Sequence, residues 1–338
     1  MTLGVAIVGC GLVGRKRAAA LPPSARALAV FDPNRQAAEN LARTLDGSVD
    51  VSSSADDAMA AAGVDLVVVA TPHNALVPAA LEAVQRGRTV LVEKPGGSSV
   101  EELVQLQREA GARRRPVYVG FNHRFHPAMV KARQLLVDGR HGRLMHIRAR
   151  YGHGGRAGYE REWRTDRSVS GGGELVDQGI HLIDLTRLFA GEVHLAFADL
   201  RTSFWPIGVE DNAFLALRSE AGALAWLHAS WTEWKNLFSF EIALERAKID
   251  ITGLGGSYGP ESLSLYEMTP AMEPPRRVTW EWPTRDDSWT LEFEHIIADM
   301  KPGSTSVAAV APATLDDAVA AFRVVDDAYR YSPTASST

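Results

Sequence analysis

The sequence predicts an α/β domain built on a doubly wound parallel sheet, followed by an α+β domain with a largely antiparallel sheet. Up to residue 122, short uninterrupted apolar runs alternate with stretches of helical composition, a pattern typical of parallel strands that helices cover on both faces. Beyond residue 123, β-like runs follow one another with turn residues between them, and all eight tryptophans lie at or after Trp163. The predicted domains are therefore 1–122 and 123–330, with a polar tail at 331–338.

The elements follow from the same pattern. The strands expected in the first domain are 4–8, 27–31, 66–70, 89–92 and 117–121, and its helices are 36–45, 55–62, 75–86 and 100–110. The strands expected in the second domain are 195–204, 213–217, 223–231, 238–244, 263–268 and 278–282, flanked by helices at 175–188, 290–300 and 315–329. One face of this second sheet needs a cover. The segment 300–305 is expected to be a flexible loop.

The composition is that of an ordinary globular protein. Of 338 residues, 46% are hydrophobic and 23% charged, which excludes wholesale disorder. The net charge of -5 lacks the basic excess that nucleic-acid binding needs. No apolar run is long enough for a membrane span, and the first strand begins near Leu3, so we expect neither membrane attachment nor a signal peptide. The single cysteine, Cys10, predicts a cytoplasmic protein without disulfides or a metal site.

The segment Gly9-Cys10-Gly11-Leu12-Val13-Gly14 directly follows the first strand and opens a helix. Glycines at this spacing permit a tight turn, close approach of the backbone to a pyrophosphate, and close packing of helix on strand. Asp32 ends the second strand, about 20 residues further on, where a carboxylate can accept hydrogen bonds from ribose hydroxyls. We therefore predict dinucleotide binding with NAD favoured. Arg35 could pair with a 2′-phosphate, so NADP stays the alternative.

Polar residues follow the third and fourth strands, at the edge where a doubly wound sheet binds ligands. Thr71, Pro72 and His73 are assigned to the cofactor site, although a turn with a capped helix explains them equally well. Glu93 is assigned to the cofactor site too. Lys94 is assigned to cofactor and substrate, because an ammonium group can bond a substrate oxygen and stabilise negative charge on it. The proline that follows permits a cis peptide bond.

Asp177 and His181 are four residues apart in a predicted helix and therefore share one face. Histidine can take up and return a proton near neutral pH, and the carboxylate can orient the imidazole or hold a substrate hydroxyl. Asp184 could join this face or only form an ion pair. The triple glycine at 171–173 indicates unusual dihedral angles or close approach of a ligand. The alternative for His181 is a core histidine with satisfied hydrogen bonds.

The segment 151–164 mixes glycines, aromatic rings and arginines, which suits a loop folded over a polyhydroxylated ligand. Arginines bind hydroxyls, carboxylates or phosphates, so the substrate could be an anionic or nucleotide-linked sugar. The alternative is a surface loop with ordinary ion pairs. The substrate contacts assigned besides Lys94, Asp177 and His181 are Arg124, His153, Tyr159, Trp163 and Arg164. The tryptophans expected in sheet packing or a subunit interface are Trp226, Trp231 and Trp234.

Together these motifs resemble the Gfo/Idh/MocA family of sugar and cyclitol oxidoreductases, and the resemblance covers nearly the whole chain. The motifs that carry it are the glycine turn, Glu93-Lys94-Pro95, Gly120-Phe121-Asn122-His123-Arg124-Phe125 and Asp177-x-Gly179-Ile180-His181-x-x-Asp184. The resemblance implies a catalytic set of Lys94, Asp177 and His181, with His181 as acid/base. It also implies an open-faced second sheet that forms homodimer or homotetramer contacts, and a last helix packed back towards the first domain. Where the family commonly carries a histidine a few residues after the Thr-Pro pair, this chain has Leu76, and His73 could supply a substitute from another position at the helix start.

The predicted function is hydride transfer between nicotinamide and a carbinol or keto carbon of a sugar, cyclitol or sugar derivative. His181 would take the hydroxyl proton and Lys94 would stabilise the oxygen, while the protein holds the reactants in near-attack geometry. Two alternatives stay open. One is a sugar-acting enzyme that recycles a tightly bound cofactor, in sugar–sugar oxidoreduction or glycoside cleavage. The other is a regulatory protein that binds NAD without turnover, which would have no need of the whole catalytic set.

Overall fold

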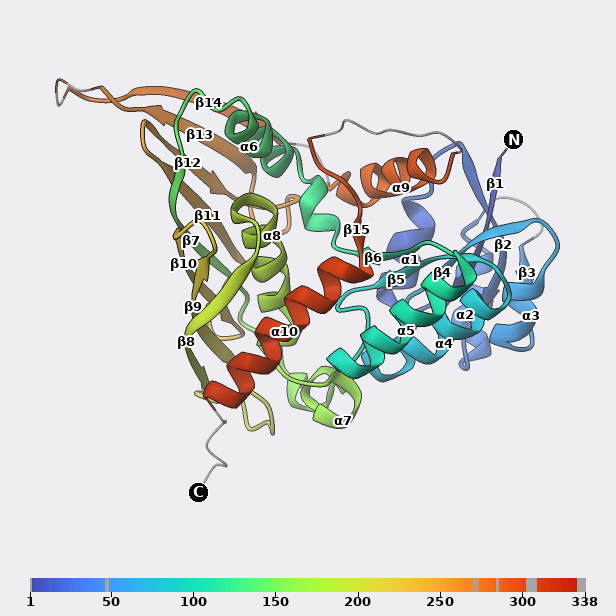
Figure 1. Ribbon diagram of the computed structural model, residues 1–338. Helices are drawn as coiled ribbons and strands as arrows, with labels where there is room; N and C mark the ends of the chain where they lie inside the picture. Colours follow the sequence, from blue (N-terminus) through green and yellow to red (C-terminus); the bar gives the residue numbers. More distant parts are fainter. Residues whose placement is uncertain are drawn as a thin grey trace. The chain divides into compact units, whose positions relative to one another are not determined.

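The structure is a computed structural model that describes residues 2–45, 49–269, 271, 273–283, 286–301 and 309–332. The chain forms two compact units (Figure 1). The first comprises Met1–Phe121, Trp289–Val307 and Ala311–Val319, and the second comprises Asn122–Ser288, Ala308–Val310 and Ala320–Thr338. The predicted domain limits themselves stay a prediction. Most of the expected loop at 300–305 and of the tail at 331–338 lies outside the described residues.

The first unit is built on a seven-stranded sheet in the order β15-β6-β5-β4-β1-β2-β3. Neighbouring strands are parallel except at the edge, where β15 runs antiparallel to β6, which confirms the predicted parallel sheet. The strand order reverses at β1 and β4, and in such sheets ligands bind beside the carboxyl ends of the strands at that point. The strands are β1 (Leu3–Val8), β2 (Ala25–Phe31), β3 (Asp50–Val51), β4 (Val64–Val69), β5 (Thr89–Glu93), β6 (Val117–Gly120) and β15 (Ala313–Thr314).

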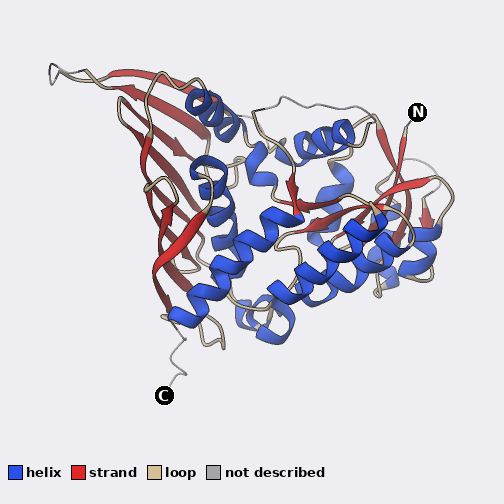
Figure 2. Cartoon of the chain, in the orientation of Figure 1, coloured by secondary structure: helices blue, strands red, loops and turns tan. Residues whose placement is uncertain are grey.

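The helices of this unit pack on its sheet (Figure 2). Asn34, Ser54 and Ser99 cap α2, α3 and α5, because each side chain accepts a backbone N–H three residues further on. No side chain caps α1, which begins after Gly11. The helices are α1 (Leu12–Ala19), α2 (Arg35–Ala42), α3 (Ala55–Ala60), α4 (His73–Gln85), α5 (Val100–Arg113) and α9 (Ser288–Asp299).

The second unit is built on an eight-stranded sheet in the order β14-β13-β12-β11-β7-β10-β9-β8. Only β7 and β10 pair in parallel, so the sheet is largely antiparallel, as predicted. Along β11, buried positions alternate with half-buried ones, which is typical of a sheet with one covered face. The strands are β7 (Leu144–Gly152), β8 (Val193–Arg201), β9 (Asn212–Ser219), β10 (Leu224–Ser230), β11 (Leu237–Leu244), β12 (Ala247–Thr252), β13 (Glu261–Glu267) and β14 (Arg276–Trp282).

Helices cover one face of this sheet (Figure 1): α6 packs on β12 to β14, and α8 packs on β7, β8 and β10. Trp226 on β10 is 45% exposed and belongs to the outer face. The helical segments are η1 (Asn122–Phe125), α6 (Pro127–Val137), η2 (Tyr159–Arg161), η3 (Trp163–Thr165), α7 (Arg167–Ser170), η4 (Leu175–Gly179), α8 (Ile180–Ala190) and α10 (Leu315–Tyr331).

For four strands and α-helices of the second unit, no bounds were predicted from the sequence: β7, β12, α6 and the short helix α7. In β7 the exposed positions carry His146, Arg148 and Arg150, so the strand shows alternation instead of the uninterrupted apolar runs that marked the others. The helix expected at 175–188 is also different. Its first turn is a π-helix, η4, and the α-helix α8 begins only at Ile180.

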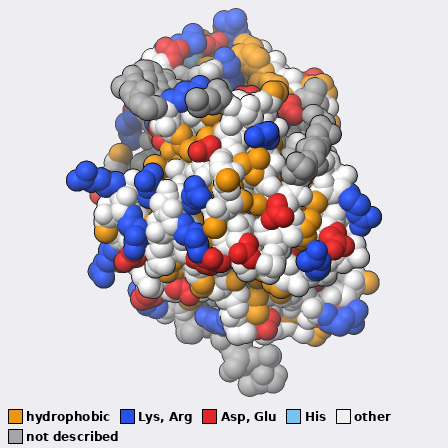
Figure 3. Space-filling model, turned by 90° about the vertical axis from the view of Figure 1, so that its right-hand side faces the viewer, with side chains coloured by type: hydrophobic (Ala, Val, Ile, Leu, Met, Phe, Trp, Pro, Cys, Tyr) orange, Lys and Arg blue, Asp and Glu red, His pale blue; other side chains and the backbone are white. Residues whose placement is uncertain are grey.

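The surface is mixed in charge. Basic and acidic side chains both occur across the face shown in Figure 3, in keeping with 36 basic and 41 acidic residues in the sequence. Among the described residues, no helix is both long enough and apolar enough to cross a membrane.

Candidate active site

The glycine turn has the shape that a dinucleotide requires. Gly9 has φ +97°, and a Cβ on it would lie 2.5 Å from the Ala70 carbonyl oxygen. A Cβ on Gly14 would lie 1.9 Å from the Gly9 oxygen, so both glycines are needed for packing within the unit. A Cβ on Gly11, in contrast, would meet nothing within 4 Å. The open space at Gly11 is where the backbone can approach a pyrophosphate.

The start of α1 completes this cradle. Its N-cap residue, Gly11, offers no side-chain acceptor to the first N–H groups of the helix, and such a terminus attracts anions. Leu12 is 59% exposed and Val13 is half-buried, so neither is a fully packed core residue. The residues at the turn therefore fit the phosphates of a dinucleotide.

Asp32 lies directly after β2, and backbone N–H groups of the glycine turn and of its own loop hold its carboxylate in place. One carboxylate oxygen accepts the Cys10 N–H at 2.8 Å, and the other accepts the Asn34 N–H at 2.8 Å. Burial, reinforced by the charge of Asp32, raises the pKa of the Cys10 thiol to about 12, so the thiol is neutral. Arg35 is exposed and pairs with Glu39 at 2.9 Å. This arrangement suits a ribose with free hydroxyls.

The residues after β4 form the start of α4. Thr71 is half-buried, and its hydroxyl donates to the Pro72 carbonyl oxygen at 3.2 Å. His73, the first residue of the helix, is 4% exposed. Leu76, at the position where the family commonly has a histidine, is fully buried and packs in the core.

Glu93 ends β5 and belongs to a buried ionic cluster. The Arg17 guanidinium is fully buried and contacts Glu93 through Nε at 2.5 Å and Glu292 of α9 through Nη1 at 2.5 Å. A Cβ on Gly120 would lie 2.4 Å from Arg17 Nη2, so the cluster needs a glycine there. Lys94 is half-buried, and the Lys94–Pro95 bond is cis. Arg17 thus holds the residue before Lys94, whereas contact of Glu93 with the cofactor stays a prediction.

His181 lies in the first turn of α8 and is buried, with 5% of its surface exposed. Asp177, one turn earlier, belongs to the π-helical turn η4, a feature that is frequent at functional sites. Its carboxylate lies 3.4 Å from Arg164 Nε and is 13% exposed. Within the second unit, the buried His181 therefore lies one helical turn after an acidic group that contacts a cation.

The backbone that carries η4 is held by a buried carboxylate. Glu210, 1% exposed, accepts the N–H groups of Gly173 at 3.0 Å and Leu175 at 3.1 Å, and the Tyr329 hydroxyl at 2.8 Å. A Cβ on Gly172 would lie 1.9 Å from the Tyr329 hydroxyl. Gly172 and Gly173 thus allow close approach of protein groups, while Gly171 has φ +79° at the end of α7.

Two buried aromatic side chains that sequence reasoning missed surround His181. The His123 ring packs edge-on against the His181 ring, with centroids 3.7 Å apart, and the Tyr151 hydroxyl lies 3.4 Å from His123 Nε2. The motif that includes His123 was recognised, but only Arg124 was assigned a role from it. Tyr151, near the end of β7, is the first residue of the segment 151–164 that was predicted to fold over the ligand, but no individual role was assigned to it.

Arg124 forms a buried bidentate ion pair. Its Nε and Nη2 contact the two Asp184 carboxylate oxygens at 2.8 and 2.5 Å, and the two side chains are only 6% and 1% exposed. Of the two alternatives for Asp184, sharing a face with His181 or forming an ion pair, the structure shows the ion pair. The role of Arg124 in substrate binding stays a prediction.

The loop after β7 places the other assigned residues near Asp177. The Gly155 N–H donates to His153 Nδ1 at 2.9 Å, and burial lowers the pKa of His153, so the ring is neutral near pH 7. Tyr159 is 2% exposed. Its pKa is raised by burial first and then by the negative charge of Asp177.

The arginines of this loop are paired with carboxylates. Arg156 lies 2.5 Å from Glu162, Arg161 lies 3.1 Å from Glu160, and Arg164 bridges Asp177 and Glu162 at 3.4 and 3.5 Å. The Arg164 guanidinium also stacks over the half-buried Trp163 ring at 4.7 Å. The loop therefore combines the aromatic surface that was predicted with little uncompensated positive charge.

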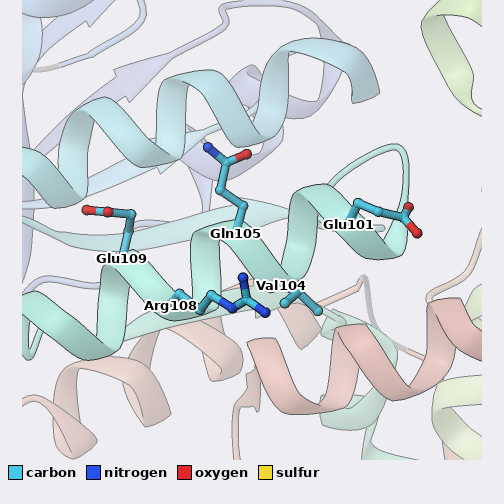
Figure 4. Close-up of a pocket in the computed structure, with 5 residues that line it drawn as sticks. All are labelled: Glu101, Val104, Gln105, Arg108 and Glu109. Atoms are coloured by element: carbon cyan, nitrogen blue, oxygen red, sulfur yellow. The ribbon is translucent and has the colours of Figure 1, made fainter.

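Two hollows on the units are not part of this arrangement. One lies along a single face of α5, where Glu101, Val104, Gln105, Arg108 and Glu109 line it (Figure 4). A hollow lined by one helix lacks the convergent polar groups of a ligand site. The other, at Arg148, Trp226 and Glu241, is on the outer face of the second sheet. Among the described residues, no group of His, Cys, Asp and Glu side chains could hold a metal ion.

Two family models match this chain. The one described as the NAD-binding Rossmann fold of the oxidoreductase family matches residues 3–121, and the GFO/IDH/MocA C-terminal domain matches residues 129–250. This chain belongs to the Gfo/Idh/MocA family. Its first unit is an NAD-binding Rossmann domain, as the glycine turn and Asp32 predicted.

Several curated relatives are sugar or cyclitol dehydrogenases. Inositol 2-dehydrogenase 4 of Saccharopolyspora erythraea is 31% identical over 66% of this chain and 65% of its own length. Inositol 2-dehydrogenase of Streptomyces avermitilis is 32% identical over 66% of this chain and 64% of its own length. The chain therefore spans slightly less than two thirds of the length of these relatives.

Solved structures share the fold over almost the whole chain. GenD2 from gentamicin A biosynthesis, in complex with NAD, is 26% identical with a TM-score of 0.82, covering 98% of this chain and 94% of its own. A levoglucosan dehydrogenase in complex with NADH has a TM-score of 0.83 at 21% identity, covering 98% of both chains. The latter likeness concerns the fold alone.

Proposed function

We propose that this protein is a cytoplasmic NAD-dependent dehydrogenase that oxidises a carbinol carbon of a sugar or cyclitol, or reduces the corresponding ketone. The observation that carries the proposal is the buried His181, packed against His123 one turn after Asp177, in a chain whose first unit has a complete dinucleotide turn. NAD, when bound, supplies the hydride acceptor. A regulatory protein without turnover would have no need of this buried acid/base arrangement.

The proton steps belong to His181 and Lys94. Loss of a hydride from the carbinol carbon leaves a protonated carbonyl unless the hydroxyl proton leaves as well. The His181 imidazole takes that proton, and Lys94 stabilises the oxygen by hydrogen bonding. Asp177 orients the imidazole or a neighbouring hydroxyl. In the reverse reaction His181 returns the proton.

The substrate we propose is a neutral polyol. Arg164, the least exposed of the loop arginines, is engaged with Asp177 and Glu162, so an anionic substrate would have to displace a half-buried ion pair. Neutral hydroxyl groups can instead form hydrogen bonds to this arginine and these carboxylates without breaking the ion pairs. Two of the relatives, named inositol 2-dehydrogenase and levoglucosan dehydrogenase, agree with this class, whereas a third, of Bacillus subtilis, is named glucose-6-phosphate 3-dehydrogenase.

We also propose that the outer face of the second sheet forms a homodimer or homotetramer contact. Phe197 and Trp226 are 37% and 45% exposed there, and their rings stack with centroids 6.0 Å apart. Leu224 on the same strand as Trp226 is 39% exposed. An apolar group of this kind on a strand surface is typical of an interface. Replacing Trp226 by Glu should lower the mass measured by light scattering, and an unchanged mass would exclude this contact.

The function is tested by following nicotinamide absorbance with inositols, neutral hexoses, levoglucosan and glucose 6-phosphate, with NAD and NADP in parallel. His181→Ala should reduce kcat by about 10²–10⁴-fold, with Lys94→Ala also strongly impaired, while both variants keep NAD affinity. The controls are His194→Ala and Lys301→Ala, which alter exposed residues and should leave turnover unchanged. Normal kcat in both active-site variants would refute the assignment.

A further inference from the structure

Two aromatic rings project into solvent beside the loop that carries His153 and Tyr159. Trp234 is 63% exposed and Phe204 is 58% exposed, and their ring centroids lie 4.6 Å apart at an interplanar angle of 85°. The two rings thus form a right-angled corner. Exposing such large apolar surfaces to water is unfavourable, so two exposed rings held in fixed positions indicate a binding site for a ligand or a partner.

The Phe204 side of this corner is held rigidly. Asp211 is fully buried, and its carboxylate accepts the N–H groups of Ser203 at 2.8 Å, Phe204 at 2.8 Å and Trp205 at 3.0 Å. The Trp205 indole N–H donates to the Trp231 carbonyl oxygen at 3.1 Å. Phe204 therefore faces solvent from an anchored backbone and not from a loose loop.

The Trp234 side is held by the substrate loop itself. Trp234 has φ +59°, a conformation that a bulky residue rarely adopts. A Cβ on Gly154 would lie 2.8 Å from Trp234 Cα, and one on Gly155 would lie 2.4 Å from the Trp205 ring. The backbone of His153 also accepts the Glu233 N–H at 3.2 Å. The two glycines of the loop are thus required for packing against this corner.

A series of ring contacts joins the corner to the acidic residue of the site. The Phe204 ring lies 5.4 Å from the Trp205 ring, and the Trp205 ring lies 5.7 Å from the Tyr159 ring. Tyr159 in turn contacts His153, with centroids 5.7 Å apart, and its hydroxyl lies in the field of Asp177. The exposed rings are therefore continuous with the residues assigned to substrate binding.

We propose that Phe204 and Trp234 form a stacking subsite for a second sugar ring, so that the substrate is a glycoside or disaccharide whose other ring reacts. This inference rests on the proposed function and extends it. A pyranose ring has an apolar C–H face that stacks on an aromatic face, and hydroxyls at its rim. The side chains that flank Trp234, Glu233 and the exposed Lys235, supply hydrogen-bonding partners for that rim. An interface with a second copy would instead favour a larger apolar area with fewer charges.

The subsite is tested by comparing one-ring and two-ring ligands. The NAD-loaded full-length protein is titrated calorimetrically with myo-inositol and galactosyl-inositol, and with glucose, cellobiose and maltose, and turnover of each is followed. The variants are Phe204→Ala and Trp234→Gly, because glycine accepts the positive φ at 234. Tyr331→Ala, which removes another exposed aromatic ring, is the matched control.

The expected result is that each variant weakens binding of a two-ring ligand about fivefold to tenfold, the size of one aromatic stacking contact, with one-ring binding unchanged. Where turnover is found, kcat/KM should fall for the disaccharide alone. Equal effects on both ligand classes, no effect, or no two-ring binding by the wild type would overturn the subsite. A drop in oligomer mass with unchanged sugar binding would assign the corner to a second copy and overturn it as well. Selective loss of two-ring binding without any turnover would keep the subsite and refute the dehydrogenase.

Discussion

The candidate functional residues fall into two halves, one on each unit, and the two halves are built from different parts of the chain. In the first unit, the dinucleotide turn consists of backbone: Gly9 and Gly14 are packed against neighbouring carbonyl groups, and Gly11 leaves space. In the second unit, the groups around His181 are buried side chains contributed by η1, β7 and α8. The shape of the dinucleotide turn depends on the absence of side chains at its glycines. The surroundings of His181 depend on contacts between side chains from distant segments of the chain. The two halves should therefore respond differently to substitution.

The largest expected difference is between two glycines of the same turn. Gly14→Ala places a Cβ 1.9 Å from the Gly9 carbonyl oxygen, whereas Gly11→Ala meets no protein atom within 4 Å. We expect Gly14→Ala to abolish NAD binding and to lower the melting temperature markedly. Gly11→Ala should keep the melting temperature of the wild type and lose NAD affinity, because the methyl group occupies pyrophosphate space. Calorimetric NAD titration and thermal unfolding of both variants measure this, and equal melting temperatures would contradict it.

Each half also contains a buried arginine, with a different charge balance. Arg124 pairs with Asp184, whereas Arg17 pairs with both Glu93 and Glu292. Arg124→Met removes the positive charge that pairs with the buried Asp184 carboxylate, which should cost about 3–5 kcal/mol of unfolding free energy. The double variant Arg124→Met with Asp184→Leu should recover most of that loss, since an apolar pair can replace a buried ion pair.

Urea unfolding of the single and double variants decides this prediction. Arg143→Met breaks an ion pair with Glu245 in which Arg143 is 71% exposed, and it should cost at most about 1 kcal/mol. A loss for Arg124→Met that is no larger than for this exposed control would show that the Asp184 charge finds other compensation.

The three-membered cluster should tolerate loss of one carboxylate better. Glu292→Gln removes a negative charge but leaves an amide oxygen that can still accept from Arg17, which also keeps Glu93. We expect a loss of about 2 kcal/mol at most, with kcat unaffected because Glu93 stays in place beside Lys94. Glu294→Gln, on the exposed side of the same helix, is the control and should be neutral. A loss comparable to that of Arg124→Met would show that both carboxylates are needed to hold Arg17.

The contrast between backbone and side chains also explains what could be predicted from the sequence. The glycine turn, Asp32 and the parallel sheet were found because their residues lie close together in the chain and serve one local geometry. His123 and Tyr151, in contrast, reach His181 only through tertiary packing, which spacing along the chain does not reveal. The π-helical turn at Asp177 was missed for a related reason. Its backbone is held by Glu210 and Tyr329 from distant segments, whereas the local sequence has ordinary helical periodicity.

The smallest expected effect concerns the carboxylate side chain that faces the dinucleotide turn. Asp32 accepts the N–H groups of Cys10 and Asn34, and a ribose diol would share the same carboxylate. Asp32→Ala should raise KM for NAD about tenfold, the equivalent of roughly 1.4 kcal/mol, and raise KM for NADP less, because the carboxylate repels a 2′-phosphate. The ratio of kcat/KM values for the two cofactors measures this directly. Arg35→Ala tests the opposite influence: if Arg35 leaves Glu39 to bind a 2′-phosphate, its removal should weaken NADP alone. An unchanged cofactor ratio in Asp32→Ala would show that its carboxylate serves only to hold the turn, so that the dinucleotide turn itself would bind through its backbone alone.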